Sequence, residues 1–262
     1  MPTSLSIASG KGGVGKTTLA INLALMEAKV SNCLLLDADM GMANAHILLG
    51  LNPDLTIKDF FDGSCSLEKV ITNGPENLKF MSGGSGLTEL LNIDKNKKLN
   101  FIRTFDQLSS NIDNLIVDVS AGAEDSSLSL LSASDKILIV LVNEPTSFTD
   151  AFTLIKVCYL EFGLKEFCLA VNMVKNENQG KEIYKKFNQI MRRFYDVNIT
   201  FVGSIPQNNK IKNSVIQKKP IILDKNNKDF YFLFERMREN IKKAPTNKFD
   251  GIKFFNSTLE KN

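Results

Sequence analysis

The chain of 262 residues has one histidine and four cysteines, and these low numbers limit the metal and redox chemistry that it can hold. Cys33, Cys65, Cys158 and Cys168 are scattered and form no C-x-x-C pair, so we expect reduced thiols of a cytoplasmic protein. His46 has no second imidazole or cysteine close by in the sequence, and we interpret it as a packing or surface residue. A chain of this length can bury a core that needs neither disulfides nor a structural metal.

The sequence also lacks an export signal and a membrane-spanning segment. Its first residues, Met1–Ser4, do not have the basic-then-apolar profile of a signal peptide, and no apolar run approaches the ~18 residues of a membrane span. We therefore expect a soluble, cytoplasmic protein with at most peripheral contact to the inner face of the cell membrane.

Positive charge is concentrated at one end of the chain. Residues 210–262 hold 13 lysines and arginines against 6 acidic residues, a net charge of +7, whereas the remainder holds 19 against 23, a net charge of −4. Such asymmetry is typical of contact with anionic lipid or nucleic acid. A plain solvated surface explains the same numbers, so charge alone leaves three alternatives open.

Short apolar runs alternate with helical patterns along the chain and predict an α/β fold. Most runs are continuously apolar, as expected of strands buried on both faces of a parallel sheet. The alternation indicates a doubly wound, mostly parallel sheet with helices on both faces and ligands at the carboxyl ends of the strands. The expected strands are Leu5–Ala8, Cys33–Leu36, Leu78–Met81, Asn114–Val117, Ile137–Val142, Phe167–Val171 and Thr200–Val202, and the expected helices are Thr17–Val30, Ser147–Glu161, Gln179–Phe194, Asn209–Lys218 and Asp229–Lys243.

A glycine-rich motif follows the first expected strand and opens the first expected helix. It matches G-x-x-x-x-G-K-[ST], a loop whose backbone N–H groups converge on phosphate while the following helix adds the positive end of its dipole. Lys16 is expected to pair with the β- and γ-phosphates, and the Thr17 hydroxyl to ligate Mg²⁺. The residues predicted to bind the nucleotide here are Gly10, Lys11, Gly12, Gly13, Val14, Gly15, Lys16, Thr17 and Thr18.

A second lysine at the start of this loop, Lys11, makes the motif resemble the deviant Walker A sequence K-G-G-x-G-K-[ST] of the MinD/ParA family of ATPases. In that family the lysine crosses a nucleotide-sandwich dimer to the phosphates bound by the partner. The resemblance therefore implies ATP or ADP with Mg²⁺, a homodimer in the ATP-bound state, and slow hydrolysis that depends on Lys11 and Lys16.

Acidic residues follow two of the expected strands, where they face the ligand crevice. Asp37 and Asp39 come after the strand Cys33–Leu36, and Asp118 ends the apolar run Asn114–Val117 in the Walker B pattern. By the resemblance, Asp39 orients and activates the attacking water, and Asp37 supports the Mg²⁺ shell. The implied metal-binding set is Thr17, Asp37 and Asp118.

Three further segments resemble the FlhG, YlxH and FleN proteins, MinD-like regulators of flagellar number and placement. Residues 37–44 followed by 48–51 resemble D-A-D-L-G-L-A-N…L-L-G-L, residues 82–86 resemble P-G-G-S-G, and residues 143–151 resemble P-E-P-T-S-[IL]-T-D-A. The likeness covers about residues 4–240 and implies an FlhF-type GTPase and flagellar C-ring components as partners. Many FlhG proteins begin with an activator helix for FlhF that this sequence does not show, so that contact was either trimmed away or is not used.

The same comparison implies how the base is recognised. Asn172, after the strand Phe167–Val171, matches the asparagine that reads the adenine edge, and Pro206 matches the proline whose loop packs beside the base. Met173 replaces an arginine that often stacks on adenine. ATP is favoured over GTP partly because the sequence has no N-K-x-D motif.

The end of the chain contains an amphipathic pattern. We expect one ATPase domain over residues 1–245 and a C-terminal tail over 246–262. On a helix beginning near Asp250, the side chains of Ile252, Phe255 and Leu259 share one face, as in the membrane-targeting helices of MinD and FlhG. A helix packed on its own domain and a frayed tail are the alternatives.

The sequence thus predicts a nucleotide switch that dimerises with ATP, associates with anionic membrane and regulates flagellum assembly. A DNA-associated ParA-like partition ATPase would instead use the basic end on the phosphate backbone, and nucleic acid is the less favoured partner. An iron-sulfur carrier of the same fold needs a cysteine pair, against which the scattered cysteines argue. A nucleotide-dependent scaffold with negligible turnover is not distinguished from a slow ATPase.

Overall fold

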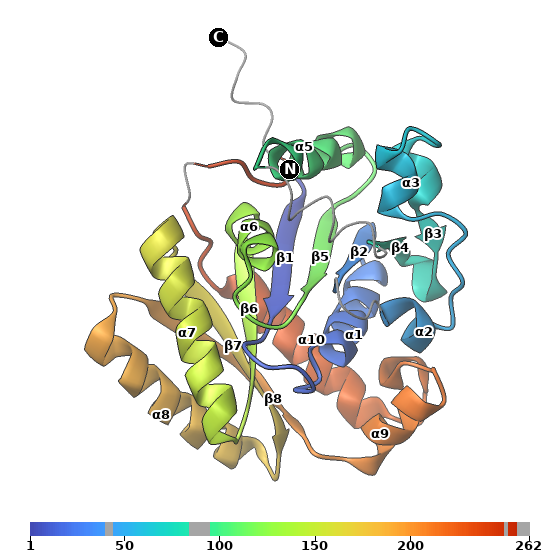
Figure 1. Ribbon diagram of the computed structural model, residues 1–262. Helices are drawn as coiled ribbons and strands as arrows, with labels where there is room; N and C mark the ends of the chain where they lie inside the picture. Colours follow the sequence, from blue (N-terminus) through green and yellow to red (C-terminus); the bar gives the residue numbers. More distant parts are fainter. Residues whose placement is uncertain (40–43, 84–94, 249–250, 256–262) are drawn as a thin grey trace.

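A mostly parallel sheet forms the centre of the computed structural model, which describes residues 1–39, 44–83, 95–248 and 251–255. Within these residues the sheet has eight strands in the order β3-β4-β2-β5-β1-β6-β7-β8 (Figure 1). Every neighbouring pair is parallel except β3 and β4. The predicted fold class is therefore confirmed. The strands are β1 Thr3–Ala8, β2 Cys33–Ala38, β3 Thr72–Asn73, β4 Lys79–Ser82, β5 Asn114–Val119, β6 Lys136–Val142, β7 Glu166–Val174 and β8 Asn198–Pro206.

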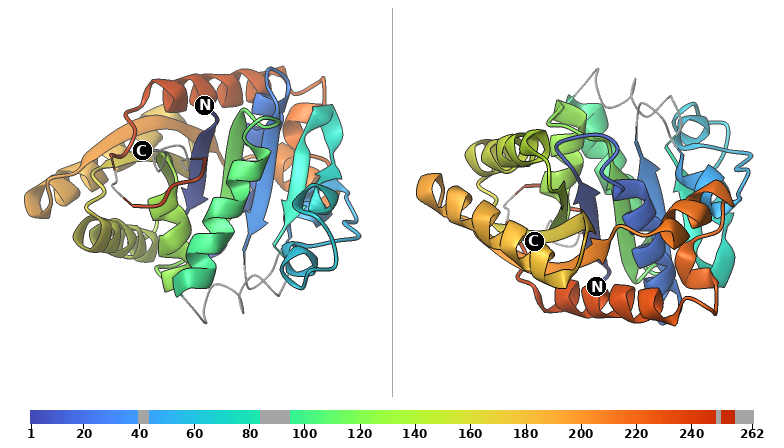
Figure 2. Two further views of the ribbon diagram at one scale, coloured as in Figure 1. Left: turned by 90° about the horizontal axis from the view of Figure 1, so that it is seen from above. Right: turned by 90° about the horizontal axis from the view of Figure 1, so that it is seen from below.

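Helices connect the strands and cover both faces of the sheet. The α-helices are α1 Lys16–Ala28, α2 Ala45–Leu49, α3 Ile57–Phe61, α5 Lys95–Thr104, α6 Asp125–Ala133, α7 Pro145–Phe162, α8 Glu177–Phe194, α9 Asn209–Ile216 and α10 Lys228–Lys243. Short 3₁₀ turns span Leu67–Val70, Pro75–Asn77, Phe105–Leu108 and Ile221–Leu223. Figure 2 shows α10 and α5 on opposite sides of the sheet. In the described part of the chain, no helix has both the length and the apolar character needed to cross a bilayer.

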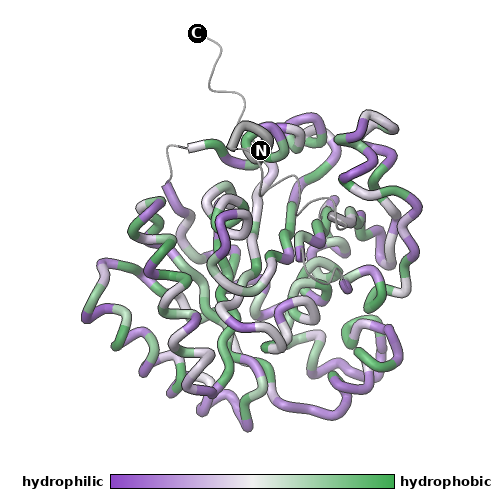
Figure 3. The backbone as a smooth tube through the Cα atoms, viewed as in Figure 1, coloured by the Kyte–Doolittle hydropathy of each residue, from purple (hydrophilic) through white to green (hydrophobic). Residues whose placement is uncertain are grey.

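The central strands are apolar on both faces because each face has its own core. In β2, Leu34 and Leu36 join the cluster under α5, α6, α7 and α8, while Cys33 and Leu35 join the cluster under α1 and α10. The strands in the middle of Figure 3 are accordingly coloured mainly as hydrophobic, and α8 alternates between hydrophilic and hydrophobic residues. Helices on both faces leave the carboxyl edge of the sheet as the place for a ligand.

The order of the strands reverses beside β1, which places the glycine-rich loop at a switch point. β1 pairs with β5 on one side and β6 on the other. The connections from these strands leave in opposite directions, and a crevice forms outside their carboxyl ends. The loop that follows β1 lies in this crevice.

The segment that follows α10 returns to the amino ends of β6 and β7 and packs there. The Asn247 side chain accepts hydrogen bonds from the backbone N–H groups of Lys165 (3.0 Å) and Glu166 (2.9 Å) and donates one to the Glu166 carbonyl (2.7 Å). Further along, the Phe254 N–H donates to the Ala133 carbonyl (3.0 Å). Residues 247–248 and 251–255 therefore pack against the domain, and the division into residues 1–245 and a tail over 246–262 stays a prediction.

The amphipathic helix predicted for the tail is wrong for the residues that the structure describes. Residues 251–255 contain no helix, and the adjacent Phe254 and Phe255 are both buried in the core. The Phe254 ring meets Phe105 edge to face, with centroids 5.1 Å apart. Burial of both rings against the core stabilises the segment without helical structure of its own. Asp250 and Leu259, which belong to the same prediction, lie outside the described residues.

Replacing Asn247 by alanine should destabilise the whole domain. Three partly buried backbone groups of Lys165 and Glu166, where β7 begins, would lose their partner, which costs about 1 to 3 kcal/mol of unfolding free energy. Denaturant unfolding of Asn247→Ala checks this, with Lys248→Ala at the neighbouring exposed position as control. Equal midpoints for the two variants would contradict the anchoring role of this segment.

Candidate functional site

The loop between β1 and α1 has the backbone geometry that its glycines predict. Gly13 and Gly15 have φ angles of 81° and 86°, and Gly15 caps α1 in the left-handed region. A side chain on Gly10 would overlap the backbone of Asp150 and Ala151 in α7, and one on Gly15 would overlap the Asn172 amide. Glycine is therefore required at both points, and the loop lies close against α7 and β7.

Lys16, Asp39 and Asp118 come together at the carboxyl ends of β2 and β5. Lys16 is the first residue of α1 and is 6% exposed, and its Nζ lies 2.5 Å from Asp118 Oδ1 and 3.9 Å from Asp39 Oδ2. Burial raises the pKa of Asp118, and Lys16 together with the Thr17 hydroxyl opposes that rise. The cation that we expect on phosphate thus neutralises the Walker B carboxylate in this structure.

Asp37 lies directly beside Asp118, because the two residues are register partners on the neighbouring parallel strands β2 and β5. Burial, with the negative charge of Asp118 as a second cause, raises the pKa of Asp37 to about 7. Its carboxylate accepts hydrogen bonds from the backbone N–H groups of Asp39 (3.2 Å) and Ala45 (3.0 Å). Asp37 therefore links the strand end to the beginning of α2.

The oxygen groups at this edge fit Mg²⁺ that is held jointly with a nucleotide. Thr17, Asp37 and Asp118 offer hard oxygen donors, and the buried Oδ2 of Asp118 has no hydrogen-bond partner. Across residues 1–39, 44–83, 95–248 and 251–255, no three His, Cys, Asp or Glu side chains group closely enough to hold a metal alone. Mg²⁺ is typically bound by one or two carboxylates together with substrate phosphates, which agrees with this sparse set.

Lys11 lies on the rim of the crevice and is engaged by the loop that follows β6. Its Nζ donates to Glu144 Oε2 (2.8 Å) and to the Thr146 hydroxyl (3.2 Å). The Lys11 and Glu144 side chains are 41% and 55% exposed, so this ion pair is weak and readily exchanged. Lys11 therefore remains available to another anion.

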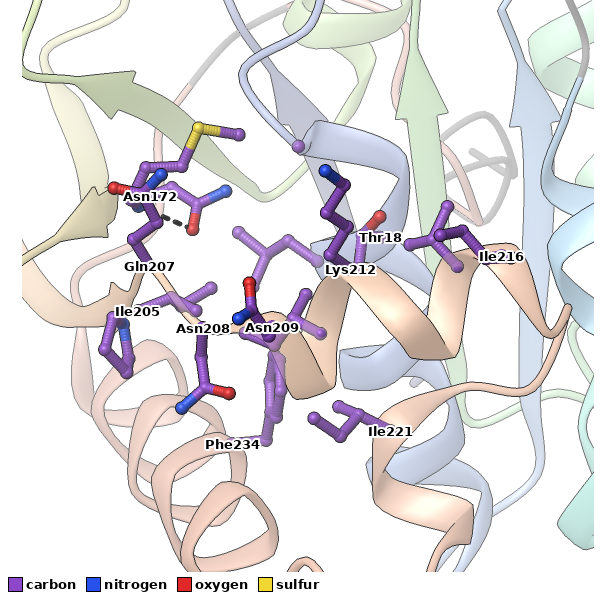
Figure 4. A pocket seen from close by; sticks show the side chains of 16 residues that line it. Thr18, Asn172, Ile205, Gln207, Asn208, Asn209, Lys212, Ile216, Ile221 and Phe234 are labelled. Carbon is purple, nitrogen blue, oxygen red and sulfur yellow. Dashed lines mark hydrogen bonds between the residues drawn. The ribbon is translucent and has the colours of Figure 1, made fainter.

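A pocket of about 490 Å³ opens beside α1, between β7, the end of β8 and α9 (Figure 4). Asn172 and Pro206 both line it, as do Thr18 and the half-exposed Met173. The Asn172 amide donates to the Val14 carbonyl (2.7 Å), which ties the pocket to the glycine-rich loop. The size and the mainly apolar walls suit a nucleoside.

The sequence predicted that most of these residues lie at the carboxyl edge of the sheet, but it did not predict the positions of Glu144 and Lys212. Glu144 was matched only as part of a family segment, because its pairing with Lys11 spans 133 positions and leaves no local pattern. Lys212 of α9, which also lines the pocket, was interpreted only as one charge of the basic end. Lys212 follows Asn208 by four residues, and this helical spacing could have indicated that the two side chains lie on the same face of α9. Residues 40–43 and 84–86, which contribute to the family resemblance, lie outside the described residues.

The fold and this site define a P-loop NTPase. The family model of ParA, described as NUBPL iron-transfer P-loop NTPase, matches residues 1–242. The chain therefore belongs to the MinD/ParA family of P-loop ATPases, which confirms the predicted resemblance.

Two curated relatives are flagellar proteins. The antiactivator FleN of Pseudomonas aeruginosa is 35% identical over 218 residues, which cover 83% of this chain and 78% of FleN. The flagellum site-determining protein YlxH of Helicobacter pylori is 28% identical, over 82% of this chain and 73% of YlxH. The chain is thus related to the FleN and YlxH regulators, as the motifs predicted.

A solved structure of MinD confirms the fold. The septum site-determining protein MinD of Pyrococcus horikoshii, complexed with Mg-ADP, superposes with a TM-score of 0.72 over 93% of this chain and 97% of that one. Its sequence identity is 22%, so the likeness bears on the architecture alone.

The raised pKa of Asp37 predicts that the nucleotide-free protein loses stability as pH rises. The folded state keeps the proton of Asp37 up to about pH 7, whereas the unfolded chain releases it near 3.8, so the stabilising difference disappears between these values. Asp37→Asn should be less sensitive to pH across this window and more stable than the parent at pH 8. Thermal unfolding in EDTA at pH 5 and pH 8 measures this, and a parallel response of both proteins would refute it.

Proposed function

We propose that this chain is a nucleotide switch in which ATP joins two copies face to face and slow hydrolysis separates them. The observation that carries the proposal is the charge cluster of Lys16, Asp39 and Asp118 beside the glycine-rich loop. Each of these side chains lies at the strand edge where phosphate would enter. The FleN and YlxH relationship supports a flagellar role for the switch.

The chain's own residues suggest how binding proceeds. Lys16 would leave Asp118 to pair with the β- and γ-phosphates, while backbone N–H groups of the loop and the first turn of α1 surround them. When bound, Mg²⁺ would neutralise charge on the phosphates and replace the positive charge that Asp118 loses. Thr17, Asp37 and Asp118 would hold it. Asn172 and Pro206 would contact the adenine.

Hydrolysis would then depend on the carboxylate of Asp39 and on a lysine, Lys11, that the partner copy supplies. Asp39 borders the cluster at 28% side-chain exposure, which leaves its carboxylate accessible to a water that it would orient and activate. Lys11 would exchange Glu144 for the phosphates of the partner. A cation supplied in this way typically accelerates phosphoryl transfer by about 10³ to 10⁵.

Asp39→Ala should retain ATP binding, stop turnover and accumulate dimers in ATP. Light scattering after size-exclusion chromatography, together with phosphate release, measures both effects. Asp54→Ala, at an exposed acid elsewhere in the chain, is the matched control and should behave like the parent. Monomers of Asp39→Ala with ATP demonstrably bound would rule out the sandwich dimer.

The same variant tests the proposed biological output, which is control of flagellar number or placement through an FlhF-type GTPase and C-ring components. A switch held in its ATP state should change flagellar counts or positions when Asp39→Ala replaces the parent protein in cells. Asp54→Ala should leave them as they are. Unchanged flagella in the Asp39→Ala cells would contradict the flagellar role and favour another ParA-type function.

We further propose that the ATP-bound dimer associates with anionic membrane through the C-terminal tail. Ile252, Lys253 and the buried Phe254 and Phe255 are its described candidates, and they would have to leave the core first. Co-sedimentation with vesicles containing phosphatidylglycerol should therefore be strong in ATP and weak in ADP, and absent from neutral phosphatidylcholine vesicles. Equal sedimentation in ATP and ADP would disprove a nucleotide-gated tail.

A further inference from the structure

Lys212 is the feature of the base pocket that neither the glycine-rich motif nor the family resemblance explains. Of the residues that line the pocket, Lys212 alone carries a charge. It lies in α9, and among the described residues its ammonium group pairs with no carboxylate. An exposed lysine on the wall of a mainly apolar, nucleoside-sized pocket can pair with an anion that a ligand brings there.

The local structure fixes the start of α9, the helix from which this side chain extends. The Asn208 side chain accepts a hydrogen bond from the Lys210 N–H (2.8 Å) and so caps α9 at its first turn. Ile211 faces the pocket and is half-buried. Figure 4 shows the Lys212 side chain extending from α9 toward the beginning of α1, beside Thr18, and the residue is exposed.

The connectivity of a nucleotide determines which group would meet this cation. The β- and γ-phosphates occupy the glycine-rich loop with Lys16, and the base occupies the pocket lined by Asn172 and Pro206. The α-phosphate and ribose must then span the edge between them, along the first turn of α1 at Thr18. Lys212 reaches this edge from the opposite wall.

We propose that Lys212 binds the α-phosphate and sets the affinity for adenine nucleotides irrespective of their phosphorylation state. This inference rests on the proposed nucleotide site. It gives the site three cations with separate tasks: Lys16 for the terminal phosphates, Lys11 for those of the partner, and Lys212 for the phosphate that ATP and ADP share. Lys212 therefore retains ADP as well as ATP and does not distinguish the two states of the switch.

Isothermal titration of ATP and ADP into the parent and four variants, Lys212→Met, Lys212→Arg, Lys210→Met and Lys16→Gln, tests this assignment. Lys212→Met keeps the aliphatic stem and removes the charge. It should raise the dissociation constants of ATP and ADP by the same factor, about fivefold for a partly exposed charged hydrogen bond. Lys212→Arg keeps the charge and should bind both within about twofold of the parent. Lys210→Met, two residues earlier on the exposed side of α9, is the control and should change neither affinity.

The remaining outcomes overturn the proposal. Parent-like binding by Lys212→Met shows that the charge contributes nothing, and a loss confined to ATP assigns Lys212 to the γ-phosphate or the dimer. Equal weakening by the Met and Arg variants shows that shape rather than charge matters. If Lys16→Gln also binds ADP like the parent, the nucleotide site itself is wrong; if it loses ADP while Lys212→Met does not, only the role of Lys212 fails.

Discussion

The ion pair between Lys16 and Asp118 is the interaction on which the rest of the site depends. Two carboxylates, Asp37 and Asp118, are buried side by side on neighbouring strands, and this arrangement is costly without a positive charge. Lys16 supplies that charge at 2.5 Å. Any phosphate that binds the loop competes for the same lysine, so nucleotide binding leaves the two acids in need of another cation. In the proposed function, the chain itself would therefore couple nucleotide binding to metal binding.

The same acids connect the phosphate site with surfaces farther away. Asp37 holds the start of α2 through the Ala45 N–H, so the charge at the strand end bears directly on the position of that helix. Leu48 of α2 and Val215 of α9 line one small cavity beside Thr18. A ligand that fills the pocket between α1 and α9 thus contacts elements packed against α2. The phosphates and the base of a nucleotide would both act on this region. Binding of a nucleotide could in this way change the position of α2 at the surface.

Local patterns in the sequence predicted the parts of the site that lie at strand ends. The loop from Gly10 to Thr17 and the acids Asp37 and Asp118 follow apolar runs directly, so the parallel sheet brings them to one edge. The pairing of Lys11 with Glu144 could not be predicted in this way, because it depends on how the connections after β1 and β6 approach each other. Helix α6 was missed because its serine-rich sequence has a weak apolar period, and its burial comes from contacts with α5 and α7.

In the tail, packing against the core overrides the helical spacing of apolar residues in the sequence. The same packing determines how much free energy the tail must regain in order to associate with a membrane. Burying Phe254 and Phe255 stabilises the folded chain by about 3 to 6 kcal/mol, and detachment would forfeit this together with the Phe254 hydrogen bond. Inserting the same rings into a bilayer regains a similar amount, and each lysine near an anionic surface adds about 1 kcal/mol. The two positions of the segment are then close in free energy. A nearly balanced equilibrium of this kind is one that a modest coupling to the proposed nucleotide-dependent dimerisation would reverse, because a few kcal/mol of differential binding suffices to exchange the dominant state.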